Sequence, residues 1–192
     1  MTAGDTETST RDRLLHAAVR LIPELGWGNV STRLVADAAG VNAGVVHYHF
    51  GSVPDLLRQA ATAATRGAVQ AAVARLTGRT DPVAAVHDLL LDLAGTGSDD
   101  ATHILLFESA LAATRDPQLQ AETAVTLTQA RQELSRWLTR VSDLPHPDST
   151  ATALAALIDG YLLHRTVDPA LDPVHLLPAL HALLLDCPPA GH

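Results

Sequence analysis

The sequence contains 10 histidines and 21 acidic residues, enough to supply general acids, general bases or metal ligands. Their spacing matches none of the short motifs that carry such chemistry, because the sequence has no Gly-x-Ser-x-Gly elbow, Gly-x-Gly-x-x-Gly loop, Walker loop or His-Glu-x-x-His helix. His47 and His49 could hold a metal, but residues two apart on a short helix point to nearly opposite sides. We therefore predict that the chain is not an enzyme and that it uses no cofactor or metal.

The segment from Ser31 to Phe50 has the residue types of a helix-turn-helix. Such a unit needs a small residue where its helices cross, a turn residue that can adopt positive φ, and apolar contacts on both sides of the turn. Ala36 and Gly40 meet the first two needs, while Ser31 and Asn42 stand at the N-cap positions of the two helices. The apolar contacts are Val35, Ala39, Val41 and Val46. The turn pattern alone leaves open an ordinary helical hairpin within a protein core.

The outward side of the second helix distinguishes these alternatives, because it carries small and aromatic residues that are unusual on a solvated face. Small residues at the helix start allow the backbone to approach base edges, and Val45 could contact a thymine methyl group. Hydroxyl, imidazole and guanidinium groups can donate to phosphate oxygens, which the N-terminus of a helix also favours. The predicted DNA-contacting residues are Ser31, Thr32, Arg33, Ala43, Gly44, Val45, His47, Tyr48 and His49.

Helix signals recur along the chain, whereas strand signals are scarce and aromatic residues make up only 3% of it. We therefore predict an all-α protein. Asp-Pro pairs mark three helix starts, at Asp81, Asp116 and Asp172, and Ser52 with Asp55 forms a capping-box-like start. The expected helices are 10–25, 32–39, 43–50, 53–76, 82–94, 99–114, 117–142, 149–166 and 173–186.

Composition and charge bear on nucleic-acid binding and on the cellular compartment. The net charge of -8 argues against nucleic acid at first sight, but residues 1–58 carry five arginines against six acidic residues, so most of the acidity lies beyond them. The single cysteine, Cys187, excludes an intramolecular disulfide. No apolar run approaches the roughly 20 residues of a membrane span, and the polar, acidic N-terminus does not resemble a signal peptide. We expect a cytoplasmic protein that is neither exported nor embedded in a membrane.

The segment from Arg13 to Leu57 resembles the TetR family of bacterial transcriptional regulators. The family features occur here as Gly26-Trp27, Thr32-Arg33, Ala39-Gly40-Val41, Gly44, His47-Tyr48-His49-Phe50 and Asp55-Leu56-Leu57. Two positions depart from the family pattern: many members have a tyrosine where this chain has His47, and many have a lysine, which often binds a phosphate, where this chain has Val53. One contact to the DNA backbone is therefore in doubt.

The resemblance implies a three-helix DNA-binding domain over residues 1–52 and a C-terminal helical bundle over residues 53–192 for ligand binding and dimerisation. It implies a homodimer, which the apolar C-terminal helices also favour. The expected dimer-interface residues are Leu154, Leu157, Ile158, Tyr161, Leu162, Leu176, Leu180, Leu183 and Leu184. The expected ligand-binding residues are His87, His103, Phe107, Leu111, Arg131 and Trp137, although a histidine or tryptophan on an apolar helix is more often a core residue.

The sequence as a whole predicts a transcriptional regulator that binds double-stranded operator DNA. We expect a repressor that leaves its operator when a small, largely apolar effector binds. The alternative is a helical ligand-binding protein of the same fold that no longer binds DNA, which the slightly acidic N-terminal region keeps open.

Overall fold

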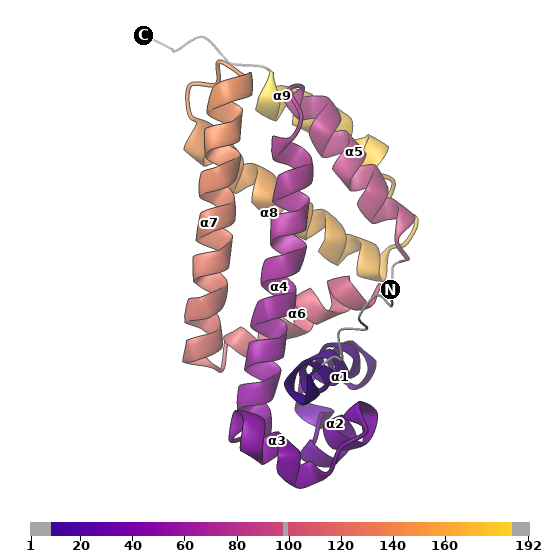
Figure 1. Cartoon of the computed structure of the whole chain (residues 1–192). Helices are drawn as coiled ribbons and strands as arrows, with labels where there is room; N and C mark the ends of the chain where they lie inside the picture. The colour runs from indigo at the N-terminus through magenta and orange to yellow at the C-terminus, as the bar shows by residue number, and fades with distance from the viewer. Residues whose placement is uncertain (1–8, 98–99, 186–192) are drawn as a thin grey trace, which may run out of the picture. The chain divides into compact units, whose positions relative to one another are not determined.

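The computed structural model describes residues 9–97 and 100–185, which form helices and contain no strand (Figure 1). The expected all-α fold is therefore confirmed. The α-helices are α1 Thr10–Leu25, α2 Thr32–Ala39, α3 Ala43–Phe50, α4 Val53–Thr77, α5 Pro82–Gly95, α6 Ala101–Ala113, α7 Pro117–Val141, α8 Pro147–Val167 and α9 Leu177–Leu184. Two short 3-10 helices, η1 Trp27–Asn29 and η2 Pro173–Leu176, complete the described part.

Aspartates cap the helices at the three Asp-Pro pairs, as expected. The Asp81 carboxylate accepts from the Ala84 amide at 3.0 Å, and Asp172 accepts from Val174 at 2.8 Å. Asp116 accepts from the amides of Gln118 and Leu119, both at 3.0 Å. Each carboxylate thereby satisfies amides that have no partner within the helix, and the proline that follows gives up no helical hydrogen bond.

The last expected helix, 173–186, is divided into η2 and α9. An α-helix that began at Pro173 would place Pro178 in its interior, where proline removes a hydrogen bond. The α-helix begins at Leu177 instead, so that Pro178 lies in the first turn, where a missing amide hydrogen is tolerated. Residue 186, residue 99 of the expected helix 99–114, and Cys187 lie outside the described residues.

The chain forms two compact units. The first contains residues up to 65 together with 101–123, and its core joins α1, α2 and α3 to the start of α4 and to α6. Leu14, Ile22, Val35, Val46 and Leu56 are fully buried in this core. A buried apolar face on each short helix thus packs α2 against α1 and α3 against α2.

The second unit contains residues 66–100 and those from 124 onward. Its core is built from the second half of α4, α5, most of α7, α8 and α9. Trp137 lies at the centre with no exposed surface, and its indole nitrogen donates to the Arg79 carbonyl at 2.8 Å. Within residues 9–97 and 100–185, no helix combines the length and apolar character needed to cross a membrane.

Candidate nucleic-acid interface and effector cavity

The turn between α2 and α3 is a glycine-capped helix end. Gly40 has φ 65° and ψ 40°, a left-handed conformation that disfavours any side chain. Its amide donates to the Asp37 carbonyl at 3.2 Å, and the Val41 amide donates to the Ala36 carbonyl at 3.0 Å. This pair of hydrogen bonds is the Schellman motif, which ends α2 within one residue and turns the chain into α3.

The side chains on the inner face of α3 pack it into the core of the first unit. Val46 has no exposed surface, and Phe50 is buried beside it in the core of the first unit. The guanidinium carbon of Arg11 lies 5.1 Å from the centre of the Phe50 ring, and the same guanidinium donates to the Gln59 amide oxygen at 2.6 Å. Asn42 is the N-cap residue of α3, but its side chain makes no capping hydrogen bond.

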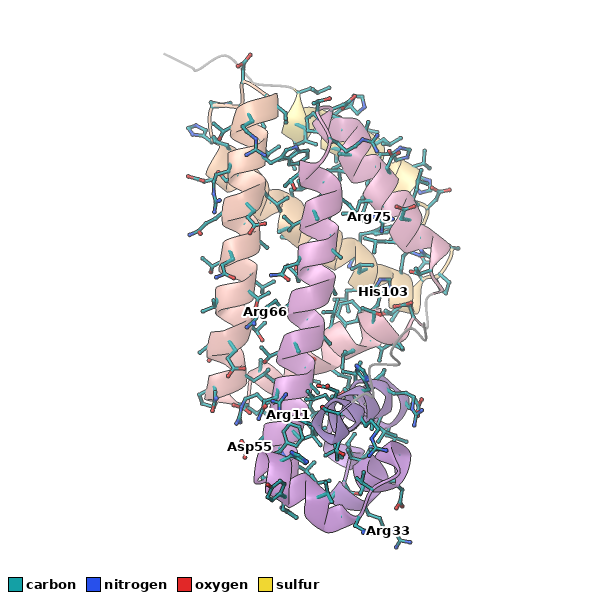
Figure 2. All side chains as sticks on the ribbon, in the orientation of Figure 1. Arg11, Arg33, Asp55, Arg66, Arg75 and His103 are labelled. Atoms are coloured by element: carbon teal, nitrogen blue, oxygen red, sulfur yellow. The ribbon has the colours of Figure 1, made fainter. Side chains whose placement is uncertain are left out.

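The opposite side of the helix-turn-helix is open to solvent. Tyr48 is 85% exposed, and the Arg33 side chain is 89% exposed and projects away from the ribbon (Figure 2). Arg33 makes one long ion pair with Asp37, at 3.7 Å, which exposure weakens. Of the nine residues expected to contact DNA, Ser31, Arg33, Ala43, Gly44, His47 and Tyr48 are exposed, whereas Thr32, Val45 and His49 are half-buried. None of the nine is fully buried, but Val45 packs against the core of the first unit.

His47 has a defined hydrogen-bonding role. Its Nδ1 lies 2.9 Å from the Gly51 carbonyl oxygen. Because a carbonyl can only accept, Nδ1 must carry the proton, and Nε2 of the neutral ring then has none to donate. His47 can therefore donate to a phosphate through Nε2 only as an imidazolium.

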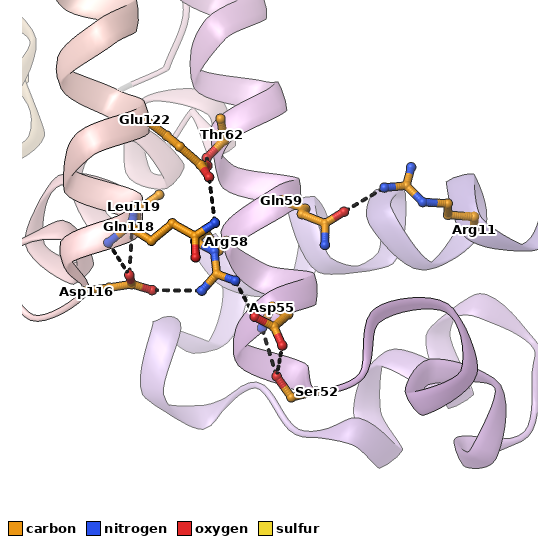
Figure 3. A network of polar contacts seen from close by, with 10 residues as sticks. All are labelled: Arg11, Ser52, Asp55, Arg58, Gln59, Thr62, Asp116, Gln118, Leu119 and Glu122. Carbon is orange, nitrogen blue, oxygen red and sulfur yellow. Dashed lines mark hydrogen bonds and ion pairs between the residues drawn. The ribbon is translucent and has the colours of Figure 1, made fainter.

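A polar network surrounds the start of α4 (Figure 3). Arg58 bridges Asp55, on its own helix, and Asp116, at the N-cap of α7, where the distance is 3.4 Å. The Ser52 hydroxyl accepts from the Asp55 amide, which is the N-cap half of the expected capping-box-like start, and it donates to the Asp55 carboxylate. The Ser52 hydrogen bond, reinforced by Arg58, lowers the pKa of Asp55. The Leu119 amide chiefly lowers the pKa of Asp116. The side chain of Arg58 is only 15% exposed.

The second unit contains a cavity of about 200 Å³ between α4, α7 and α8. Its lining residues are Val69, Ala72, Val73, Leu76, Leu127, Ala130, Arg131, Leu134, Thr152, Ala155, Ala156, Ile158 and Asp159. Most of this wall is aliphatic, and Arg131 on α7 and Asp159 on α8 are the ionisable residues within it. An apolar wall with few polar groups is the usual character of a small-molecule site.

The six residues expected to bind a ligand do not gather at this cavity. Arg131 lines it, whereas Trp137 is packed in the core of the same unit. His87 is half-buried on α5 and is not among the lining residues. The other three, His103, Phe107 and Leu111, lie on α6, which belongs to the first unit. The small residues of α4 and α8 that form the wall carry no distinguishing sequence signal, because alanine and valine are common on any packed helix.

The residues expected at the dimer interface are packed largely against their own chain. Leu154, Tyr161, Leu162, Leu180 and Leu184 are buried, and Leu157, Ile158, Leu176 and Leu183 are half-buried. The exposed side of α8 instead carries a different apolar row. This row consists of Ala153, Ala156, Gly160, Leu163 and Val167, of which Gly160 is half-buried and Ala156 also lines the cavity. Its spacing alternates between three and four residues, so it forms one continuous stripe.

Known families and proteins resemble both parts of the chain. Residues 14–60 match the family of bacterial regulatory proteins described as the tetR family, and residues 77–186 match the tetracyclin repressor-like C-terminal domain. The nicotine-responsive transcriptional repressor HdnoR of Paenarthrobacter nicotinovorans is 27% identical over 171 residues, which cover 86% of this chain and 87% of HdnoR.

Two solved structures are similar in fold to this chain. The regulator SCO7518 of Streptomyces coelicolor A3(2) has a TM-score of 0.75 and 29% identity, and the match covers 92% of this chain and 99% of that one. The multidrug binding protein EbrR in complex with ethidium has a TM-score of 0.70 and 28% identity, and the match covers 93% of this chain and 100% of EbrR. These similarities extend over nearly the whole sequence.

Proposed function

We propose, since this chain belongs to the tetR family of bacterial regulatory proteins, that it is a transcriptional repressor that binds operator DNA through α2 and α3. The observation that carries the proposal is the exposed face of α3, where Gly44 and Tyr48 contribute nothing to the core. A small residue followed by an exposed aromatic suits a helix that enters the major groove, with the small residue near base edges and the hydroxyl near a phosphate.

The same proposal assigns a homodimer. One helix reads few base pairs, so a two-fold axis that places two reading helices about one DNA turn apart gives useful specificity. We place the pairing face on the exposed stripe of α8 that includes Gly160 and Leu163, because the leucines buried within the chain are not available to a partner. The buried leucines then support this face from within.

The cavity of the second unit is the proposed effector site. Helix α4 begins beside the helix-turn-helix in the first unit, and its second half lines the cavity in the second. An effector that binds one position of α4 more tightly than another would bias the DNA-binding state, and only such a difference in affinity can do so. HdnoR is named for its response to nicotine, and structures of EbrR hold malachite green and ethidium, so a ring compound is the kind of effector that these similar proteins suggest for this chain.

Fluorescence anisotropy with labelled DNA from upstream of the protein's own gene tests the proposal, at a stated salt concentration. We expect Arg33→Ala to weaken binding about tenfold and to reduce the salt slope by about one unit, as loss of one phosphate contact does. Tyr48→Phe, which removes only the hydroxyl, should weaken binding less. Arg20→Ala is the matched control, because Arg20 is an exposed arginine of the same unit paired with Glu24 on α1.

Two outcomes separate the functions. Equal affinity of Arg33→Ala, Arg20→Ala and the unchanged protein for this DNA would overturn the proposed reading face. Failure to bind any tested duplex, combined with ligand binding in the cavity, would support the alternative of a ligand-binding protein that has lost DNA binding.

A further inference from the structure

The two charged residues in the cavity wall differ in how well their own chain satisfies them. Arg131 donates to the Thr128 hydroxyl at 3.1 Å, one turn earlier on α7. Within the described part of the chain, no group donates a hydrogen bond to the Asp159 carboxylate or forms an ion pair with it. Desolvation by the surrounding wall raises the pKa of Asp159, and the charge of Arg131 opposes this rise. The Asp159 side chain is exposed, so water reaches the carboxylate, but no donor of the described chain competes with a ligand for it.

Such a carboxylate gains most from a ligand that brings its own positive charge and N–H donors. A charge-assisted hydrogen bond is stronger than a neutral one, and an apolar surrounding strengthens it further. Both residues line the same cavity, so a ligand of either charge meets one like charge; Arg131 already donates to Thr128, whereas Asp159 accepts from no group of the described chain. The net charge of -8 also favours approach of a cation over that of an anion.

We propose that the effector is a protonated organic amine on an aromatic or alicyclic ring, with its ammonium group donating to Asp159 and its ring against the aliphatic wall of α4 and α8. This inference rests on the proposed function for the effector's regulatory role, but not for its binding. The size is consistent, since a dry cavity of roughly 150 Å³ accommodates one benzene ring. The cavity of about 200 Å³ therefore suits one ring or a compact pair of rings.

Isothermal titration calorimetry on the full chain without DNA tests the inference with three probes of one shape. These are 2-naphthylmethylamine as the cation, 2-naphthylmethanol as the neutral analogue and 2-naphthoate as the anion. The unchanged protein should bind the amine at least about tenfold more tightly than the alcohol, and the anion most weakly. Equal or tighter binding of the alcohol or the anion would overturn the proposal.

Two cavity variants should change this preference in opposite directions. Asp159→Asn should weaken amine binding about tenfold and leave alcohol binding nearly unchanged. Arg131→Met keeps most of the aliphatic stem but removes a like charge, so it should strengthen amine binding. Asp143→Asn is the matched control, because it removes one acidic charge from an exposed position of the same unit that does not line the cavity. Misfolding cannot produce opposite effects at Asp159 and Arg131.

The DNA assay distinguishes this inference from the proposed function. One outcome is that the chain binds DNA while the unchanged protein and Asp159→Asn both bind the amine no more tightly than the alcohol. In that case the repressor proposal stands and the proposed effector class is wrong. If the amine binds through Asp159 but no duplex is bound, the ligand class stands and the repressor proposal fails.

Discussion

Gly44 occupies a position where the fold does not require glycine. It is exposed in the first turn of α3, and it is not one of the described glycines with positive φ, which are Gly26, Gly40 and Gly51. A Cβ atom added at Gly44 would meet no atom within 4 Å. Because glycine within a helix is less favourable than alanine by about 0.5–1 kcal/mol, Gly44→Ala should stabilise the protein by up to that amount. For a chain of this size the melting temperature should rise by about 1–4 °C.

The same substitution should weaken DNA binding. If the start of α3 approaches base edges as closely as we propose, an added methyl group must displace the helix or the DNA. We expect a loss of about tenfold in affinity, or about 1.4 kcal/mol, which is similar to the effect of one mismatched base pair. Stability and affinity would then change in opposite directions, which a general folding defect cannot cause.

Two glycine variants provide the comparison. Gly67→Ala makes the same change on an exposed helical glycine of α4, where a Cβ also meets no atom within 4 Å, so it should stabilise without affecting DNA binding. Gly40→Ala should destabilise by about 1–2 kcal/mol, because φ 65° is unfavourable for alanine even in open space. Urea unfolding and anisotropy on the same samples give both quantities. Unchanged affinity of Gly44→Ala would refute the close approach of α3 to DNA.

Two further predictions concern the support of α4 and the pairing face. Arg58→Met should reduce the free energy of unfolding by about 1–2 kcal/mol at neutral pH, given the solvent screening of partly exposed carboxylates. Because the pKa values of Asp55 and Asp116 lie below the ordinary 3.8 in the folded state, their contribution is complete above that pH and is lost as the pH falls through the folded values. The effect of Arg58→Met on urea unfolding should therefore shrink below pH 3.8, and a penalty independent of pH would contradict this account. Leu163→Glu, at a position that is 51% exposed, should convert the dimer to a folded monomer in sedimentation, whereas Leu91→Glu, at a similarly exposed position of α5, should not. A dimer that survives Leu163→Glu would exclude the α8 stripe as the pairing face.

The helices could be predicted from sequence because local chemistry fixes their ends. Asp81 and Asp116 cap through their own carboxylates, and Gly40 adopts the one conformation that the corner requires. These interactions span only a few residues, so their signals are complete within a short window. The division of the last expected helix also has a local cause, because Pro178 lacks an amide hydrogen and so favours the first turn of a helix.

The cavity could not be located in this way, because it is a space that side chains from three helices fail to fill. Most of the residues expected to bind a ligand were histidines or aromatic residues. A large ring such as that of Trp137 instead fills space and belongs to the core. Small residues such as Ala72 and Ala155 leave space open, and they do so only where the facing helices also carry short side chains. Of the six residues expected to bind a ligand, Arg131 lines the cavity, but its position on a largely polar helix gave no signal that set it apart from the other arginines.

The two faces of α8 present a related problem. Its apolar residues are spread around the helix and do not gather on one face, so the hydrophobic pattern locates the helix but does not tell which face packs against its own chain. Packing within the second unit decides this, because it buries Leu154 and leaves Leu163 half exposed. A helix that has satisfied one apolar face internally and retains a second, regularly spaced one has a surface whose burial requires another molecule. Gly160 on that surface permits close backbone approach, so a second copy of α8 is the partner that this spacing suits best.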